Sequence, residues 1–166
     1  MTSLKKIQTK IQNLEEANRI VRNWNSSNEK VVFTNGCFDL LHLGHIDYLS
    51  KAKDLGTKLI VGVNSSESVE KLKGPSRPIH SSLTRCTILA AFEFIDLVII
   101  FEEETPLELI KVLKPNVLVK GGDYTVETII GAKEVISYGG KVQVIPFLAG
   151  YSTSDIVTKI QSFSKS

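Results

Sequence analysis

The chain has 166 residues, of which 42% are hydrophobic and 23% charged, values typical of a soluble globular domain with one sizeable core. Its 20 basic and 18 acidic residues give a net charge of +2, and the absence of a Lys/Arg-rich run disfavours a nucleic-acid-binding surface. Two cysteines are too few for a disulfide framework, and no signal-peptide pattern or long apolar span stands out, so we expect a cytoplasmic protein without membrane contacts.

Strand-like and helix-like segments alternate along most of the chain. Apolar residues recur at helical spacing over residues 4–24, and a polar break follows, so residues 1–29 are expected to form a helical extension. Short Val-, Ile- and Leu-rich runs predict strands at residues 30–35, 58–63, 97–101, 116–119 and 141–145. Helices are expected at residues 43–55, 82–94, 106–114, 126–138 and 153–163, and a long polar loop at 64–81.

This alternation predicts one further domain over residues 30–163. Nearly continuous apolar strands separated by helices are typical of a parallel sheet that is buried on both faces. We therefore expect an α/β fold: a Rossmann-like, doubly wound, five-stranded parallel sheet with helices on both faces. Ligands of such sheets bind outside the carboxyl ends of the strands, so the loops that follow the strands should meet at one edge.

The loop after the first predicted strand carries the strongest chemical signal. His42 and His45, two of only three histidines, lie there at the start of a predicted helix. Residues three apart share a helix face, and the free amides and dipole of a helix N-terminus favour anions. The pair therefore indicates a site for nucleotide phosphates. A zinc site is disfavoured because no third ligand is visible nearby.

Glycine and short polar residues surround the two histidines. Gly44 costs helix stability, which is explained either by a nucleotide lying against the helix or by packing against another element. Gly36 suits the turn that leaves the first strand. Thr34 and Asp39 can fix this turn through side-chain-to-backbone hydrogen bonds, and for Asp39 a substrate contact is an equal alternative.

Cationic residues follow two other predicted strands. Lys73 and Arg77 lie after the second strand, where cations could bind the departing pyrophosphate, although charged loop residues are often only solvated. Arg85 opens the next helix, an unfavourable place for a cation beside the helix dipole. Lys120 follows the fourth strand and could meet a substrate phosphate.

Two further loops combine a structural interpretation with a functional one. The glycines of Gly121-Gly122-Asp123 permit close backbone approach to a ligand, or form an ordinary turn. The run Ser152 to Asp155 is typical of a capping box, with Ser152 as the cap. The hydroxyl groups of Ser152 and Thr153 could also bind a triphosphate.

These motifs resemble the nucleotidyltransferases that carry an H-x-G-H motif, and among them the D-glycero-β-D-manno-heptose 1-phosphate adenylyltransferases. The resemblance covers about residues 30–160 and rests on the stretches 33–45, 72–78 and 120–124. It implies an enzyme that transfers adenylyl from ATP to the heptose 1-phosphate, giving ADP-heptose and pyrophosphate for lipopolysaccharide synthesis. It also implies Mg²⁺ bound mainly through the ATP phosphates, a separate sugar kinase upstream, and a homodimer.

The resemblance also implies roles for individual residues. The residues assigned to catalysis are His42, His45, Lys73 and Arg77. Those assigned to the nucleotide are Thr34, Asn35, Gly36, Phe38, Gly44, Arg85, Ser152 and Thr153. Those assigned to the sugar substrate are Asp39, Lys120, Gly121, Gly122 and Asp123. No residue is assigned to a metal.

Two alternative functions stay open at this point. One is a cytidylyltransferase acting on glycerol 3-phosphate or a similar small phosphate. Such relatives carry Arg-Thr-Glu-Gly-Ile-Ser-Thr before the last helix, and this chain has Phe147 at the arginine position. The other is a nucleotide-binding module without catalysis, which would be free to lose the histidines and cations that this chain retains.

Overall fold

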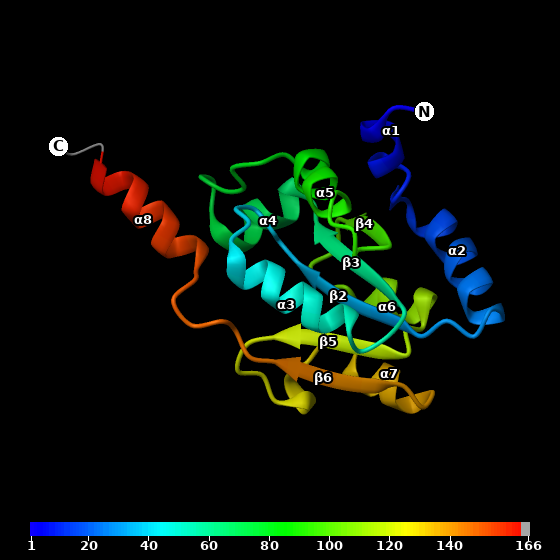
Figure 1. Ribbon diagram of the computed structural model, residues 1–166. Coiled ribbons are helices and arrows are strands. Elements are labelled where there is room, and N and C mark those ends of the chain that lie inside the picture. Colours follow the sequence, from blue (N-terminus) through cyan, green and yellow to red (C-terminus); the bar gives the residue numbers. More distant parts are fainter. Residues whose placement is uncertain (164–166) are drawn as a thin grey trace.

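Six parallel strands form a single sheet in the computed structural model, which describes residues 1–163 (Figure 1). The strands are β1 (Ile11–Gln12), β2 (Val31–Gly36), β3 (Lys58–Asn64), β4 (Leu97–Phe101), β5 (Val117–Gly121) and β6 (Lys141–Ile145). Their order is β1-β4-β3-β2-β5-β6, and all neighbours are parallel. After β2, the chain adds β3 and β4 on one side of it and then returns to add β5 and β6 on the other side, while β1 lies at the edge beside β4. The topological switch point therefore lies between β2 and β5, where ligands of such sheets bind.

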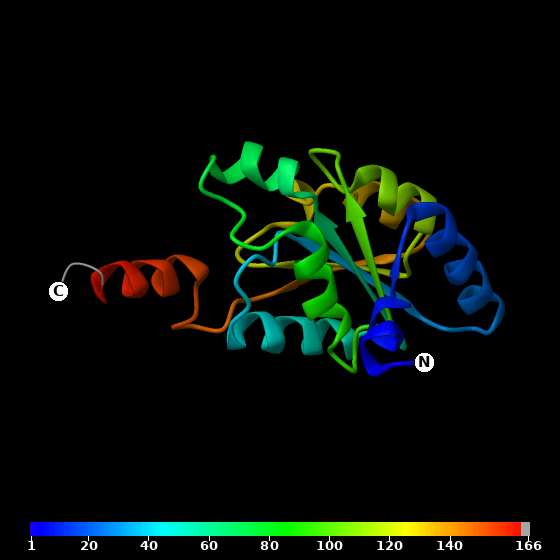
Figure 2. The same cartoon turned by 90° about the horizontal axis from the view of Figure 1, so that it is seen from above.

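Helices cover both faces of the sheet (Figure 2). They are α1 (Ser3–Gln8), α2 (Leu14–Ser26), α3 (Leu43–Lys53), α4 (Ser66–Lys73), α5 (Ser82–Ala90), α6 (Leu107–Leu113), α7 (Ala132–Ser137) and α8 (Thr153–Phe163), with a 3₁₀ turn η1 at Val126–Thr128. One core layer lies under α3 and α5, and the other under α2, α6 and α7. Val32 points into the first layer and Phe33 into the second, because successive strand residues face opposite sides. The predicted α/β class is confirmed.

The helix predicted at residues 4–24 is wrong in one respect, because α1 and α2 are separated by β1. Asn13 caps α2 by accepting a hydrogen bond from the amide of Glu16, and a helix cannot run through its own cap. The two residues of β1 pair with Val98 and Ile99 of β4. The sheet therefore has six strands where the sequence predicted five.

Two other predicted segments also differ. The polar loop expected at residues 64–81 contains α4, which Ser65 caps through the amide of Ser68 and which ends at Gly74, at φ +93°. The helix expected at 126–138 is reduced to η1 and α7, because Gly131 adopts φ +87° between them. Local backbone conformation explains both differences.

The first 29 residues share the sheet and the core with the rest of the chain. Besides β1, this segment supplies Ala17 and Val21, both buried, to the layer beneath α2. The division at residue 29 stays a prediction, and the packing of Val21 offers a way to test it.

We expect Val21→Ala to lower the free energy of unfolding by about 2 kcal/mol, because two buried methyl groups and their packing are lost. The whole chain should still unfold in one transition, measured by circular dichroism in urea. Val112→Ala is the matched control, because Val112 is exposed on α6. A separate early transition for Val21→Ala would instead mean that residues 1–29 unfold independently.

Candidate active site

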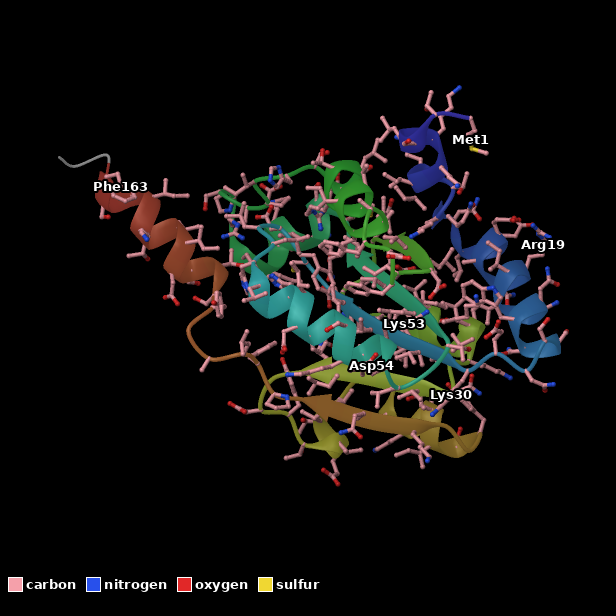
Figure 3. The ribbon with its side chains drawn as sticks, in the orientation of Figure 1. Met1, Arg19, Lys30, Lys53, Asp54 and Phe163 are labelled. Atoms are coloured by element: carbon pink, nitrogen blue, oxygen red, sulfur yellow. The ribbon has the colours of Figure 1, made fainter. Side chains whose placement is uncertain are left out.

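Two adjoining cavities open at the carboxyl edge of the sheet, and we call them together the edge cleft. Their volumes are about 330 and 270 Å³. The residues that line both are His45, Tyr48, Lys73, Phe147 and Thr153. The cleft lies at the N-terminal end of α3, opposite the end marked by Lys53 and Asp54 in Figure 3. It therefore occupies the switch-point edge that the topology favours.

The two histidines of the motif lie against each other at the start of α3. His42 is the N-cap residue, and its ring centroid is 3.9 Å from that of His45. The backbone amide of His42 donates to Nδ1 of His45 at 3.3 Å. Because Nδ1 accepts this bond, the proton of a neutral His45 is on Nε2. His45 thus has an N–H donor free for a ligand in the cleft that it lines.

Burial disfavours the protonated form of both imidazoles. Burial lowers the pKa of His45 to about 4, and the nearby charges of His42 and Lys73 act in the same direction. Burial also lowers the pKa of His42. The pair therefore provides neutral hydrogen-bond donors, and fixed positive charge must come from other residues.

His42 and Gly44 pack against the segment that enters α8. The Tyr151 ring stacks on His42 with centroids 6.5 Å apart. A Cβ at Gly44 would come within 3.0 Å of the His42 ring and 3.2 Å of Tyr151 Cβ. Gly44 thus has a packing role here, and its nucleotide role stays a prediction. Nδ1 of His42 is buried and has no partner within residues 1–163, so it is a free polar atom at this wall.

Arg77 lines the cleft with part of its guanidinium unpaired. Its Nε donates to Asp39 at 2.7 Å. Its Nη2 atom is buried and has no hydrogen-bond partner among the described residues. A buried donor left unpaired is costly, so an anion in the cleft would satisfy it. Lys73, at the end of α4, lines the same cleft.

Asp39 holds the segment that carries Arg77. Its buried carboxylate accepts from Arg77 and from the amides of Ile79 and His80, at 2.7–2.9 Å. Burial alone would raise the pKa of Asp39, but the amides of His80 and Ile79 and the Arg77 guanidinium hold it below its usual value. Both oxygens are therefore engaged within the protein, and a substrate contact stays a prediction.

Arg85 is the one cation of the predicted set that lines neither cavity of the edge cleft. It is 1% exposed, and it donates to the carbonyl oxygens of Cys37 at 2.7 Å and His80 at 3.1 Å. Another guanidinium nitrogen donates to Ser82 Oγ at 3.3 Å. These bonds tie α5 to the loop that follows β2, which accounts for a cation at the start of this helix.

Lys120 lies on the β5 side of the cleft. Its ammonium is 3.4 Å from Asn35 Oδ1 and 5.8 Å from the ring centroid of Tyr124. Burial lowers the pKa of Lys120 below its usual value. None of the ion pairs found within residues 1–163 involves this lysine. It is a partly desolvated cation that lacks an anionic partner.

Three glycines at or just after the ends of β2 and β5 lie against aromatic side chains. A Cβ at Gly121 or Gly122 would come within 3.0 Å of the Phe147 ring, and Gly122 also has φ +108°. Asp123, the last of this predicted group, is exposed and lines neither cavity. At the other strand, a Cβ at Gly36 would come 2.9 Å from the Phe38 ring, so the turn needs glycine there.

The remaining predicted residues have mainly structural partners. Thr34 is fully buried, and its hydroxyl group lies 2.5 Å from the hydroxyl group of Tyr48. Ser152 caps α8 as expected, by accepting from the amide of Asp155 at 3.0 Å. Thr153 donates to the carbonyl oxygen of Leu40 at 3.3 Å and lines both cavities.

Apart from Phe38, the aromatic lining of the cleft was not predicted from the sequence. Tyr48, Tyr124, Phe147 and Tyr151 line it, and none was among the predicted site residues. Three of them follow β5 or β6, so their position after a strand was the available signal. Tyr48 lies inside a predicted helix, where an aromatic residue looks like ordinary core.

The described residues contain no group of three or more His, Cys, Asp or Glu that could hold a metal ion. Over the same residues, no helix combines the length and the hydrophobicity needed to cross a membrane.

The profile of the cytidylyltransferase-like family matches residues 33–159. The bifunctional protein HldE of Caulobacter vibrioides is 52% identical over 153 residues, which are 92% of this chain and 32% of that protein. HldE of Geotalea uraniireducens is 50% identical over 155 residues, again 32% of its length. The chain thus spans about a third of these relatives.

Two solved structures share the fold of this chain. A lipopolysaccharide core biosynthesis protein from Thermoplasma volcanium is 27% identical with a TM-score of 0.58, and the match covers 72% of this chain and 97% of that one. Pantoate-beta-alanine ligase from Francisella tularensis, at 17% identity and a TM-score of 0.58, shares the fold over 91% of this chain and 76% of its own. With its H-x-G-H motif at the switch-point edge and a profile match over most of its length, the chain belongs to the cytidylyltransferase-like family of nucleotidyltransferases.

Proposed function

We propose that this protein transfers the adenylyl group of ATP to D-glycero-β-D-manno-heptose 1-phosphate, giving ADP-heptose and pyrophosphate. The observation that carries the proposal is the edge cleft, which brings His42 and His45 together with Lys73, Arg77 and Lys120. Phosphoryl transfer needs positioned cations and donors more than it needs a protein nucleophile. The heptose branch is supported by the motif resemblance and by the 52% identity to HldE.

The reaction is an in-line displacement at the α-phosphorus of ATP. An oxygen of the sugar phosphate forms the new P–O bond, and the bond from the α-phosphorus to the bridging oxygen breaks. Pyrophosphate leaves with that electron pair. The acceptor is already an anion, so no general base is required. Nε2–H of His45 would donate to the α-phosphoryl oxygens, whose charge grows in the transition state. Lys73 and Arg77 would stabilise the departing pyrophosphate.

Mg²⁺ would enter as part of the nucleotide substrate. The described residues offer no cluster of metal ligands, and Asp39 is already engaged by three donors. Mg²⁺ is often held chiefly by substrate phosphates and water, with few protein ligands. The chemistry that it supplies is neutralisation of phosphate charge, and no protein cage for it is required.

The partner and assembly expectations rest on the resemblance. A sugar kinase would supply the heptose 1-phosphate, and the protein would act in the cytoplasm as a homodimer. α8 supports a contact with a second subunit. None of its described residues is buried, the helix extends away from the sheet, and the exposed Phe163 lies at its far end (Figure 3).

Nucleotide and acceptor choice are tested together by pyrophosphate release. We expect release with ATP and the heptose 1-phosphate, and little with CTP, GTP or UTP, or with glycerol 3-phosphate as acceptor. Preferential release with CTP and glycerol 3-phosphate would contradict the heptose branch and favour the cytidylyl alternative. No release with any pair would favour a binding module.

We expect His45→Gln to lower kcat by about 10² or more, the effect of removing a preorganised donor to transition-state charge. The thermal unfolding midpoint should stay close to that of the native protein. His80→Gln is the matched control, because the His80 side chain lines neither cavity of the edge cleft. Near-native turnover of His45→Gln would refute the catalytic role.

We expect Asp39→Asn to lower kcat about tenfold and to raise the inhibition constant of pyrophosphate, because Arg77 loses its charged anchor. Stability should fall by about 1–3 kcal/mol, since an amide nitrogen would face buried donors. Asp47→Asn is the control, because Asp47 makes only a surface pair with Lys51. Lost stability with unchanged pyrophosphate inhibition would show that Asp39 does not position Arg77 for catalysis.

A further inference from the structure

A third cavity, of about 130 Å³, lies beside the edge cleft, and we call it the distal recess. Asn35, Lys120 and Tyr124 line both the recess and the edge cleft. These three residues come from the carboxyl ends of β2 and β5 and from the turn after β5. The recess therefore shares a boundary with the proposed reaction site, and Lys120 is the cation on that boundary.

Lys120 is the natural anchor for an anion at this boundary. Its ammonium has a neutral oxygen, Asn35 Oδ1, at 3.4 Å and no carboxylate partner within the described residues. The Tyr124 ring beneath it contributes a weak attraction and no charge. A partly buried cation without a counter-ion favours a phosphate beside it. If the acceptor phosphate binds there, the rest of the acceptor can extend into the recess.

The lining of the recess is partly apolar and partly polar. Pro106, Leu118 and Ile129 supply apolar surface, and Ile130 completes it with an exposed side chain. The hydroxyl group of Thr128 donates to the carbonyl oxygen of Thr125 at 2.8 Å and accepts from the hydroxyl group of Thr125 at 3.5 Å, which leaves one lone pair available. Such a lining suits a short chain of hydroxylated carbons, with C–H groups on the apolar wall and hydroxyl groups on the polar atoms.

The size of the recess limits what it can hold. Its volume of about 130 Å³ is less than half that of the larger cavity of the edge cleft, at about 330 Å³. The recess therefore suits a small substituent of the acceptor, such as a two-carbon arm, better than the nucleotide. In a heptose 1-phosphate, the phosphate on C1 and the C6–C7 arm on C5 lie on opposite sides of the ring oxygen and extend away from the ring. A phosphate at Lys120 can thus leave the arm within reach of the recess.

We propose that the distal recess binds the exocyclic C6–C7 arm of the heptose and thereby selects heptose 1-phosphates over hexose 1-phosphates. This inference rests on the proposed function. Thr128 and Ile130 are then specificity residues, and they lie outside the groups that act on the reacting phosphates. A hexose has one carbon and one hydroxyl group fewer, so it leaves part of the recess unfilled and Thr128 without its partner.

The test compares two acceptors that differ only in the arm: D-glycero-β-D-manno-heptose 1-phosphate and β-D-mannose 1-phosphate. The native protein should prefer the heptose by about tenfold or more in kcat/KM, as expected for one extra carbon and hydroxyl group. Ile130→Phe narrows the recess and should reduce this preference at least about fivefold. Thr128→Val, which keeps the volume, should reduce it about threefold.

Ile136→Phe is the matched control, because Ile136 is an exposed isoleucine on α7 that does not line the recess. It should leave the preference unchanged. The KM for ATP should be the same in all variants. If Ile130→Phe is unstable in thermal unfolding, the comparison rests on Thr128→Val.

An unchanged preference in both recess variants would overturn the proposal, and so would a rise in the KM for ATP, which would place the nucleotide in the recess. Equal loss of activity with both sugars would also overturn it. If the native protein releases no pyrophosphate with ATP and either sugar, the proposed function itself fails. That outcome is distinguishable from a failure of the recess proposal, in which the native protein is active but the recess variants keep its preference.

Discussion

Two buried charges hold the candidate active site together. Asp39, in the loop after β2, accepts hydrogen bonds from Arg77 and from the amides of Ile79 and His80. Arg85, on α5, donates to carbonyl oxygens on both sides of the same junction, those of Cys37 and His80. The loop that leads to the histidines and the segment that carries Arg77 are thus fixed relative to each other. Because neither charge is exposed to water, removing either would leave buried partners unsatisfied.

In the edge cleft, the residues that carry positive charge differ from those that offer directed hydrogen bonds. Burial disfavours the charged forms of His42 and His45 and lowers the pKa of each, so both would meet an anion as oriented donors. Lys73 and Arg77, from the stretch after β3, and Lys120, from β5, provide the positive charge around the same cleft. A triphosphate and a sugar phosphate together carry several negative charges, and these would be distributed among separate cations. The cleft therefore suits two phosphate-bearing ligands that must approach each other despite their mutual repulsion.

Much of the fold and part of the site could be predicted from the sequence because the signals are local. Apolar strand runs predicted the parallel sheet, and the spacing of His42 and His45 predicted their shared helix face. β1 escaped prediction because two residues carry no periodicity, and α4 because it is short and polar. The bonds from Arg77 to Asp39 and from Arg85 to Cys37 join residues 38 and 48 positions apart, and no local pattern reports such a contact. For the same reason the distal recess, formed from several separate segments, could not be predicted.

The short strand β1 also affects how exposed the sheet is to pairing with other chains. It pairs with β4, whose sequence Leu97-Val98-Ile99-Ile100-Phe101 is apolar throughout and would otherwise be the last strand of the sheet. An exposed apolar edge strand is a template for pairing with other chains, whereas a two-residue edge offers little for another strand to extend. By pairing with β4, residues 11–12 thus disfavour its pairing with a strand of another chain. Loss of this segment would turn the most apolar strand of the protein into an aggregation-prone edge.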